Sequence, residues 1–199
     1  MTKILVIESS PRGDQSVSRK VTQDLVAKLK AKGGAEIITR DLSKNPLPHL
    51  DGNILQAFFT PPEARSEALK AAIAPSDKAV DELLGADTIV IGLPMWNFGL
   101  PSVLKAWIDH IVRAGRTFSF AGGKPEGLVK NKEVYLVVAS GSVFSAGPFS
   151  GHDFVVPYVK AVLGFIGITN IHVVRAEGLN DPAVAANALE KARTQYASV

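Results

Sequence analysis

The sequence predicts an α/β fold, a doubly wound domain in which helices flank a central five-stranded parallel sheet. Three observations support this prediction: apolar runs rich in Ile and Val recur along the 199 residues, most of these runs are continuous, and helix-length stretches separate them. Continuous apolar runs are typical of strands that are buried on both faces of a parallel sheet. Alternation of such strands with helices favours right-handed crossovers around one sheet. The length is that of a single domain, and we expect residues 1–199 to form it.

Five segments are the predicted strands. The four strongly apolar segments are residues 3–7, 88–93, 133–139 and 171–174, and a more polar fifth segment spans 36–40.

Five further segments are predicted helices. Residues 18–32 place Leu25 and Leu29 at helical spacing before two glycines end the segment. The next helices in the chain are predicted at 63–84, divided by Pro75, and at 101–114, 155–165 and 183–197. On the helix 101–114, the spacing of Lys105, Asp109 and Arg113 is interpreted as surface ion pairs.

Two long connections interrupt this alternation and are predicted to be irregular. Residues 42–62 contain four of the twelve prolines, and residues 115–129 contain four glycines together with Phe118 and Phe120. Connections of this length in a compact domain are usually functional or cover a partner surface.

The composition excludes several functional classes. The chain has no cysteine, which excludes disulfides, thiolate zinc sites, iron–sulfur clusters and a catalytic thiol. The 22 Lys and Arg and the 19 Asp and Glu leave a net charge of +3, and the basic residues are dispersed, so we expect no nucleic-acid partner. The four histidines lack the paired spacing of a metal site, and no metal is predicted. The apolar start is interrupted at Glu8, too early for a signal peptide or a membrane helix, so we expect a cytoplasmic protein outside the membrane.

Polar residues follow the first predicted strand and lead into the first helix. Residues 8–18 contain the hydroxyls of Ser10, Ser16 and Ser18 and the flexible Gly13. Ligands of open parallel sheets bind beyond the carboxyl ends of the strands, and the free N–H groups of a helix start favour a phosphate dianion. The loop therefore predicts a phosphate site, although a simple helix cap by Ser16 or Ser18 explains the same residues. No G-x-G-x-x-G, P-loop or G-x-S-x-G motif occurs, which disfavours a dinucleotide-binding Rossmann domain, a phosphoryl-transfer enzyme and an α/β hydrolase.

A second candidate loop, residues 94–101, follows the predicted strand 88–93. Met95, Trp96 and Phe98 surround the amide of Asn97 between two prolines. Bulky apolar side chains around one amide suit a flat aromatic ligand with a hydrogen-bonding edge. The alternative is a buried turn whose apolar side chains fill the core.

A third candidate loop, residues 140–145, follows the predicted strand 133–139. Its first residues, Ser140, Gly141 and Ser142, are small enough for backbone N–H groups to approach a ligand closely. The same composition is typical of any turn. This loop alone is therefore weak evidence for a binding site, and it supports one only together with the other two loops.

The chain resembles the flavodoxin-like, FMN-dependent NAD(P)H azoreductases and quinone reductases of bacteria over nearly its whole length. The most specific stretches are Pro94-Met95-Trp96-Asn97-Phe98 and residues 104–109, and supporting stretches are 113–118, 127–129 and 163–168. The resemblance implies a flavodoxin-like sandwich, FMN as cofactor, NADH or NADPH as electron donor, and quinones or azo compounds as acceptors. FMN then carries the chemistry, and no catalytic side chain is assigned. One stacking face holds one flat ring at hydride distance, so donor and acceptor are expected to bind in turn, in a ping-pong two-electron cycle.

The resemblance also assigns binding residues. It implies that the FMN phosphate is held by Ser10, Ser16, Val17 and Ser18. It implies that the isoalloxazine ring is lined by Met95, Trp96, Asn97 and Phe98, with further contacts from Ser140, Gly141 and Ser142. The predicted walls of the substrate pocket are Phe120 and Phe144.

The sequence departs from the family pattern at three places. Trp96 replaces the common Tyr, which keeps an aromatic surface without the phenol. Ser140, Gly141 and Ser142 follow Ala139 where many relatives have Ser-Arg-Gly-Gly, which leaves backbone contacts for this loop. Phe144 stands where relatives often have His, so the pocket floor becomes more apolar.

Members of the family are homodimers with two flavin sites at the subunit interface. This implies that the connections 42–62 and 115–129 cover a partner subunit, with Phe120 over the pocket.

Two alternatives remain: a flavodoxin-like one-electron carrier protein, and an interaction module of the same fold without a ligand. Carriers that dock on basic reductases tend to be acidic, whereas this chain carries +3, and a module without a ligand gains little from the aromatic segment.

Overall fold

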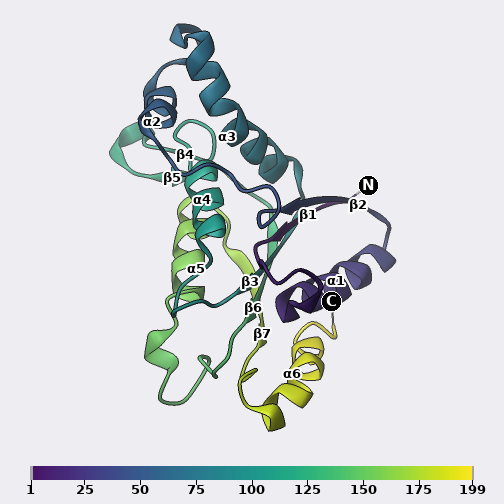
Figure 1. Ribbon diagram of the computed structural model, residues 1–199. Helices are drawn as coiled ribbons and strands as arrows, with labels where there is room; N and C mark the ends of the chain where they lie inside the picture. The colour runs from purple at the N-terminus through teal and green to yellow at the C-terminus, as the bar shows by residue number, and fades with distance from the viewer. Residues whose placement is uncertain (1, 199) are drawn as a thin grey trace.

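Five parallel strands form the central sheet of the computed structural model, which describes residues 2–198 (Figure 1). The strands are β1 (Thr2–Glu8), β2 (Ala35–Asp41), β3 (Thr88–Pro94), β6 (Glu133–Ala139) and β7 (Asn170–Ala176). Their order is β2-β1-β3-β6-β7, and every neighbouring pair is parallel. The chain builds the sheet outward in both directions from β1, so the strand order reverses between β1 and β3. The predicted doubly wound, five-stranded sheet is confirmed.

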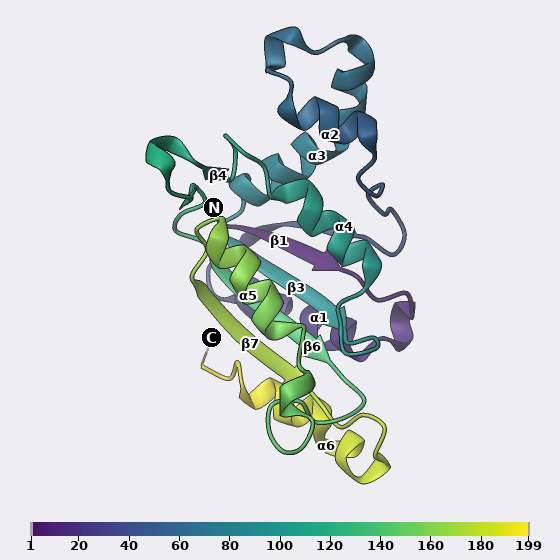
Figure 2. The ribbon, with the colours of Figure 1, turned by 90° about the vertical axis from the view of Figure 1, so that its left-hand side faces the viewer.

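Helices cover both faces of this sheet (Figure 2). One face packs against α1 (Val17–Ala31) and α6 (Pro182–Thr194), and the other packs against α3 (Glu67–Gly85), α4 (Ser102–Ile111) and α5 (Val156–Phe165). Short 3₁₀ turns lie at Gly13–Gln15, Pro62–Ala64, Ala121–Gly123 and Ser150–His152. None of the helices within residues 2–198 combines the length and the apolar character that crossing a bilayer requires.

Alternate residues of the strands enter two separate apolar cores. In β1, Leu5 and Ile7 belong to the core beneath α3, α4 and α5, whereas Ile4 and Val6 belong to the core beneath α1 and α6. Both sides of each central strand are therefore buried, which explains why these strands are continuous apolar runs in the sequence.

The connection 42–62 contains a helix, so its prediction as irregular was wrong. α2 (Gly52–Phe59) begins at Asp51, whose carboxylate accepts a hydrogen bond of 2.8 Å from the N–H of Ile54, and it buries Ile54 and Ala57. The prolines of this connection lie before and after the helix and leave its interior free. A capped helix of eight residues therefore fits between residues that would break a longer one.

Two further predictions need correction. α3 begins at Glu67, after the Ser66 cap, and continues undivided through Pro75. Proline removes a single N–H from the helix, and Ile73 and Val80, on either side of it, stay buried against the core. Packing therefore holds the helix together. The connection 115–129 is also not wholly irregular, because β4 (Phe118–Ser119) pairs with β5 (Glu126–Gly127) in a small antiparallel hairpin.

Arg113 is buried, although the sequence predicted it in a surface ion pair. Only 4% of the residue is exposed. Its guanidinium donates to the hydroxyl of Ser76 at 2.5 Å and to the carboxylate of Asp77 at 3.2 Å, both on α3, and lies 4.2 Å from the ring centre of Phe58 on α2. This one side chain therefore connects α2 and α3 to the end of α4.

We expect Arg113→Met to lower the free energy of unfolding by about 2–4 kcal/mol, because methionine keeps an apolar stem but removes the charged hydrogen bonds and the cation–π contact. The matched control is Lys105→Met, which removes an exposed pair with Asp109 at 2.6 Å on α4 and should cost less than about 1 kcal/mol. Urea denaturation followed by circular dichroism measures both changes, and equal losses would contradict the role given to Arg113.

Candidate functional site

Three loops meet beyond the carboxyl ends of β1, β3 and β6 and enclose a pocket of about 280 Å³. This position includes the point where the strand order reverses, where open α/β sheets bind their ligands. The predicted residues that line this pocket are Ser10, Ser16, Val17, Ser18, Met95, Trp96 and Gly141. The structure thus brings residues from all three predicted loops into one site.

The first loop places two buried hydroxyls at the N-terminus of α1. The Oγ atoms of Ser16 and Ser18 lie 3.0 Å apart, and Ser16 Oγ also accepts a hydrogen bond of 3.3 Å from the N–H of Arg19. Ser16 is therefore the helix cap and a pocket residue at once, so the two interpretations of the sequence do not exclude each other. Within residues 2–198, the N–H groups of Val17 and Ser18 have no hydrogen-bond partner. Free N–H groups and hydroxyls at a helix start form a site for an anion.

The second loop is a strained two-residue turn. The backbones of Trp96 and Gly99 exchange two hydrogen bonds of 2.9 Å, while Asn97 and Phe98 between them have φ angles of 47° and 67°. Left-handed backbone is unfavourable for a side chain as bulky as Phe and costs on the order of 1–3 kcal/mol. The turn leaves Trp96 and Phe98 about half exposed. The side chains are thus presented to a ligand and do not fill the core.

Trp96 lines both the pocket and a neighbouring hollow of about 470 Å³. This second hollow is lined by Asn97, Ser9 and Pro11, together with Trp96. Asn97 therefore lines the neighbouring hollow and not the pocket itself.

The third loop contributes mainly backbone. The hydroxyl of Ser140 donates to the carbonyl of Ser142 at 2.8 Å, so it is used within its own loop. Gly141 lines the pocket, and a Cβ at this position would lie 2.4 Å from the amide nitrogen of Asn180. A side chain at this position would therefore displace the Asn180 amide, which also lines the pocket. Phe144 is buried, and its ring contacts that of Phe98 edge-on at 6.1 Å, but neither ring lines the pocket.

Asn180, Leu179 and Arg12 also line the pocket, although the sequence analysis did not select them. The N–H groups of Leu179 and Asn180 donate to the carbonyls of Ser140 and Gly141 at 3.1 and 2.9 Å. The turn that follows β7 is thereby attached to the loop that follows β6. Ligands of open parallel sheets bind beyond the carboxyl ends of the strands. The same principle, applied to the outer strand β7, predicts that this turn lies at the site.

Phe120 does not reach the pocket of its own chain. It packs against Phe118, which lies 4.8 Å from the ring of Phe165 at the last residue of α5. α5 runs antiparallel to the strands, so this hairpin lies toward the amino ends of the strands, away from the pocket (Figure 2).

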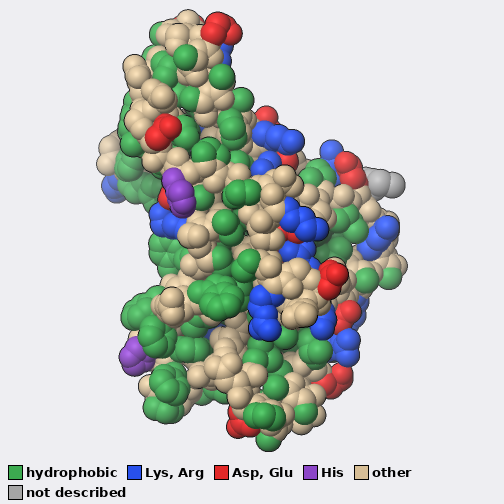
Figure 3. All heavy atoms as spheres, viewed as in Figure 1, with side chains coloured by type: hydrophobic (Ala, Val, Ile, Leu, Met, Phe, Trp, Pro, Cys, Tyr) green, Lys and Arg blue, Asp and Glu red, His purple; other side chains and the backbone are tan. Residues whose placement is uncertain are grey.

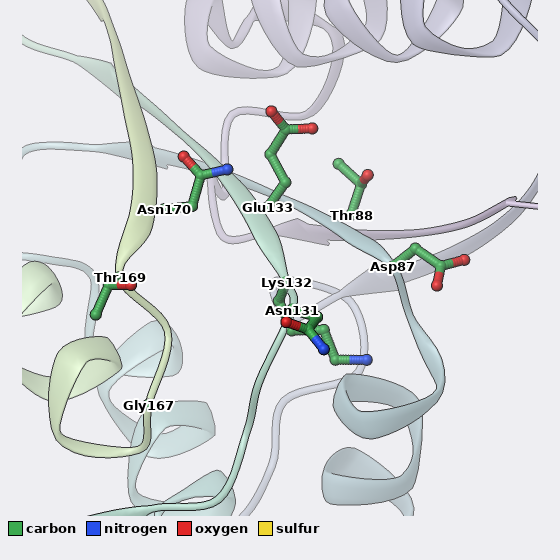
Figure 4. Close-up of a pocket in the computed structure, with 8 residues that line it drawn as sticks. All are labelled: Asp87, Thr88, Asn131, Lys132, Glu133, Gly167, Thr169 and Asn170. Carbon is green, nitrogen blue, oxygen red and sulfur yellow. The ribbon is translucent and has the colours of Figure 1, made fainter.

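A larger hollow of about 530 Å³ lies at the amino edge of the sheet (Figure 4). Its lining includes Asp87, Asn131, Lys132 and Glu133, and it contains no aromatic residue. The ammonium of Lys132 donates to the carbonyl of Leu84 at 2.7 Å, near the C-terminus of α3. Lys132 is therefore engaged by the helix end, and this hollow offers neither a free cation nor a stacking surface. No group of three or more His, Asp and Glu side chains in the described part of the chain is arranged to hold a metal ion.

The family of the chain follows from a comparison with known proteins. Residues 2–199 match the family model described as a flavodoxin-like fold. The chain belongs to this flavodoxin-like family. A relative from Beijerinckia indica, named FMN-dependent NADH:quinone oxidoreductase, is 48% identical over 200 residues, which cover 100% of this chain and 99% of the relative. A relative from Hahella chejuensis, named FMN-dependent NADH:quinone oxidoreductase 2, is 49% identical over 191 residues, or 95% of each chain.

Solved structures of the flavodoxin-like family share the fold. An azoreductase from Bacillus anthracis has a TM-score of 0.89 at 33% identity, covering 98% of this chain and 99% of that one. An FMN-dependent NADH-azoreductase from the same species, solved in complex with FMN, has a TM-score of 0.85 at 26% identity and covers 99% of both chains.

We expect the double change Ser16→Ala and Ser18→Ala to weaken FMN binding at least tenfold, because each lost hydrogen bond to a phosphate is worth about 1.5–3 kcal/mol. Quenching of flavin fluorescence measures the affinity. The control is Ser66→Ala, which removes a cap of the same kind from α3, where Ser66 Oγ accepts from the N–H of Leu69. An unchanged FMN titration in the double variant would remove the phosphate assignment.

Proposed function

We propose that this chain is an FMN-dependent NADH:quinone oxidoreductase that also reduces azo compounds. The observation that carries the proposal is a single pocket in which the start of α1, with Ser16 and Ser18, meets the segment of Met95 and Trp96. Relatives named for this activity align with nearly the whole chain, and similar solved structures are azoreductases. We further propose that residues 1–199 act as one FMN-binding domain in the cytoplasm, where reduced nicotinamide is available.

The groups of the chain fit FMN at both ends of the ligand. The hydroxyls of Ser16 and Ser18 and the free N–H groups of Val17 and Ser18 match the phosphate dianion. Met95 and Trp96 provide an apolar surface for the flat ring, and Gly141 allows backbone to approach it. Bound FMN supplies the two-electron chemistry, with NADH or NADPH as the donor.

The side chains act by position. The indole of Trp96 lines the pocket and is half exposed, so it can exclude water from one face of a bound flat ring. Phe98 is also half exposed but does not line the pocket. Phe144 packs edge-on against Phe98 and supports the Asn97–Phe98 turn from below. We assign no catalytic side chain, and protons for the acceptor come from water. A one-electron carrier is disfavoured, because the relatives are named for reduction of small molecules and the chain is not acidic.

Steady-state turnover tests this function directly. With NADH or NADPH and a panel of quinones and azo dyes, double-reciprocal plots at several acceptor concentrations should be parallel, because donor and acceptor use the same surface in turn. Intersecting lines, with a demonstrated ternary complex, would show separate sites, and absence of turnover with every acceptor would favour the carrier.

We expect Trp96→Ala to change the selectivity among acceptors more than the rate of flavin reduction by NADH, because the indole acts through shape and stacking and transfers no proton. Stopped-flow absorbance separates the two half-reactions. Trp96→Phe should restore much of the original selectivity, and an equal loss in both half-reactions for Trp96→Ala would contradict this role.

We also propose that the chain forms a homodimer in which the β4–β5 hairpin of each subunit covers the pocket of the other. Phe120 on this hairpin is 61% exposed, and Phe59 at the end of α2 is 84% exposed. In Figure 3, hydrophobic side chains gather on the side formed by α2, the hairpin and α5, whereas charged side chains gather over α1 and β2. Large apolar surfaces of this kind favour burial in an interface, which for a stable dimer exceeds about 2,000 Å².

Mixed dimers test whether Phe120 acts across the interface. We expect Phe120→Ala to raise the KM for quinones, and the Ser16→Ala/Ser18→Ala double variant to be largely free of FMN when FMN is limiting, because it binds FMN at least tenfold more weakly. When the two variants are mixed and exchange subunits, one pocket of each mixed dimer regains both intact elements, so activity with quinones should recover. No recovery despite proven subunit exchange, or a fully active monomer in sedimentation, would overturn the proposal.

A further inference from the structure

A buried carboxyl group lies beneath the start of α1 and has no part in the proposed function. Glu8 is the last residue of β1 and is 2% exposed. Its Oε2 atom has no hydrogen-bond partner within residues 2–198. A buried carboxylate without donors is unfavourable, and the neutral acid is the form that such a site accepts most readily.

Glu8 extends toward the face of the sheet that α1 covers. Gly92 on β3 leaves the room for it, because a Cβ at Gly92 would lie 2.9 Å from Glu8 Oε2 and 2.5 Å from the hydroxyl of Thr22. The hydroxyl of Thr22 in turn donates to the carbonyl of Ser18 at 2.9 Å. Glu8 is thus about one helical turn below the N–H groups and hydroxyls at the start of α1.

The charged groups around Glu8 come from two elements. Arg19 on α1 and Asp41 at the end of β2 form an ion pair at 3.0 Å, and the ammonium of Lys44 lies 3.8 Å from the same Asp41 carboxylate. The residue of β3 beside Glu8 is Gly92, which carries no charge. Arg19 is therefore shared with Asp41 and does not neutralise Glu8 alone. Burial raises the pKa of Glu8 to about 7, with Arg19 opposing this shift and Asp41 adding to it.

We propose that Glu8 takes up a proton from solvent when a phosphate dianion binds at the start of α1, so that its charge state determines how strongly the site prefers a phosphorylated flavin. This inference rests on the proposed function, because it takes the FMN phosphate as the anion. An ionised Glu8 repels the dianion through a partly buried environment, whereas a neutral Glu8 does not. Riboflavin has a hydroxyl where FMN has its phosphate, so its binding should not depend on the charge of Glu8.

The direction of the pH dependence follows from this arrangement. The raised pKa of Glu8 means that the folded chain favours the neutral acid, so the stability that Glu8 contributes is present at low pH and is lost as the pH rises through about 7. FMN affinity should fall over the same interval. The FMN phosphate itself is already a dianion there, since its second pKa is about 6.

The experiment compares the wild-type chain, Glu8→Gln and the control Glu36→Gln, which changes an exposed glutamate on β2. FMN and riboflavin are titrated between about pH 6.5 and 8.5 by fluorescence quenching. We expect the FMN affinity of the wild type and of Glu36→Gln to fall roughly tenfold over this range, a factor that reflects one charge acting on a dianion across a helical turn. Glu8→Gln should lose this dependence, and riboflavin should show little in any chain.

Calorimetry in two buffers of different ionisation enthalpy gives a second readout that needs no variant. Near pH 7.5, FMN should bind to the wild type with net proton uptake, and riboflavin should bind without it. Equal proton uptake for wild type and Glu8→Gln, or the same pH slope for FMN and riboflavin, would overturn the inference and leave the proposed function intact. If the wild type binds FMN at no pH, the proposed function itself is wrong.

Discussion

The geometry of the candidate site depends on the parallel pairing of β3 with β1 and β6. Parallel pairing brings the carboxyl ends of all three strands to one edge, and backbone hydrogen bonds continue the pairing past the strand ends. The N–H of Ser9 donates to the carbonyl of Gly92 at 3.1 Å, and the N–H of Met95 donates to the carbonyl of Ala139 at 2.8 Å. The loops therefore leave the sheet in fixed directions, and residues distant in sequence line one pocket.

Rigid supports surround the pocket where its loops would otherwise be free to move. The paired backbones of Trp96 and Gly99 hold the strained Asn97–Phe98 turn, so its energetic cost is offset by the surrounding structure. A carboxylate does the same for the third loop: Glu177 accepts the N–H groups of Phe144 and Ser145 at 2.9 Å each, and Arg175 binds Glu177 at 3.0 Å. Since FMN carries the chemistry, the chain contributes mainly fixed positions, and these supports provide them.

The sequence was sufficient to predict those features that arise from local patterns. Strands and most helices follow from apolar periodicity, and the three loops follow from their places after strands. Features that depend on contacts between distant residues could not be predicted in this way. The short α2 is stable because Arg113, more than fifty positions away in sequence, covers Phe58. Asn180 joins the pocket through its contact with Gly141, and the left-handed backbone of Phe98 has no residue signal, because glycine is the residue that such a conformation favours.

The two edges of the sheet show why hollow size does not identify the binding site. At the amino edge, the C-terminal carbonyls of α3 already receive the ammonium of Lys132, so the partial charge of the helix end is satisfied within the chain. At the carboxyl edge, the N–H groups of Val17 and Ser18 remain available in the described structure, and an apolar surface at Trp96 lies beside them. The smaller hollow thus combines the partial positive charge at the start of α1 with a stacking surface at Trp96. The described residues that line the larger hollow provide neither. An anionic, aromatic ligand is therefore expected at the helix terminus whose backbone N–H groups the fold leaves without hydrogen-bond partners.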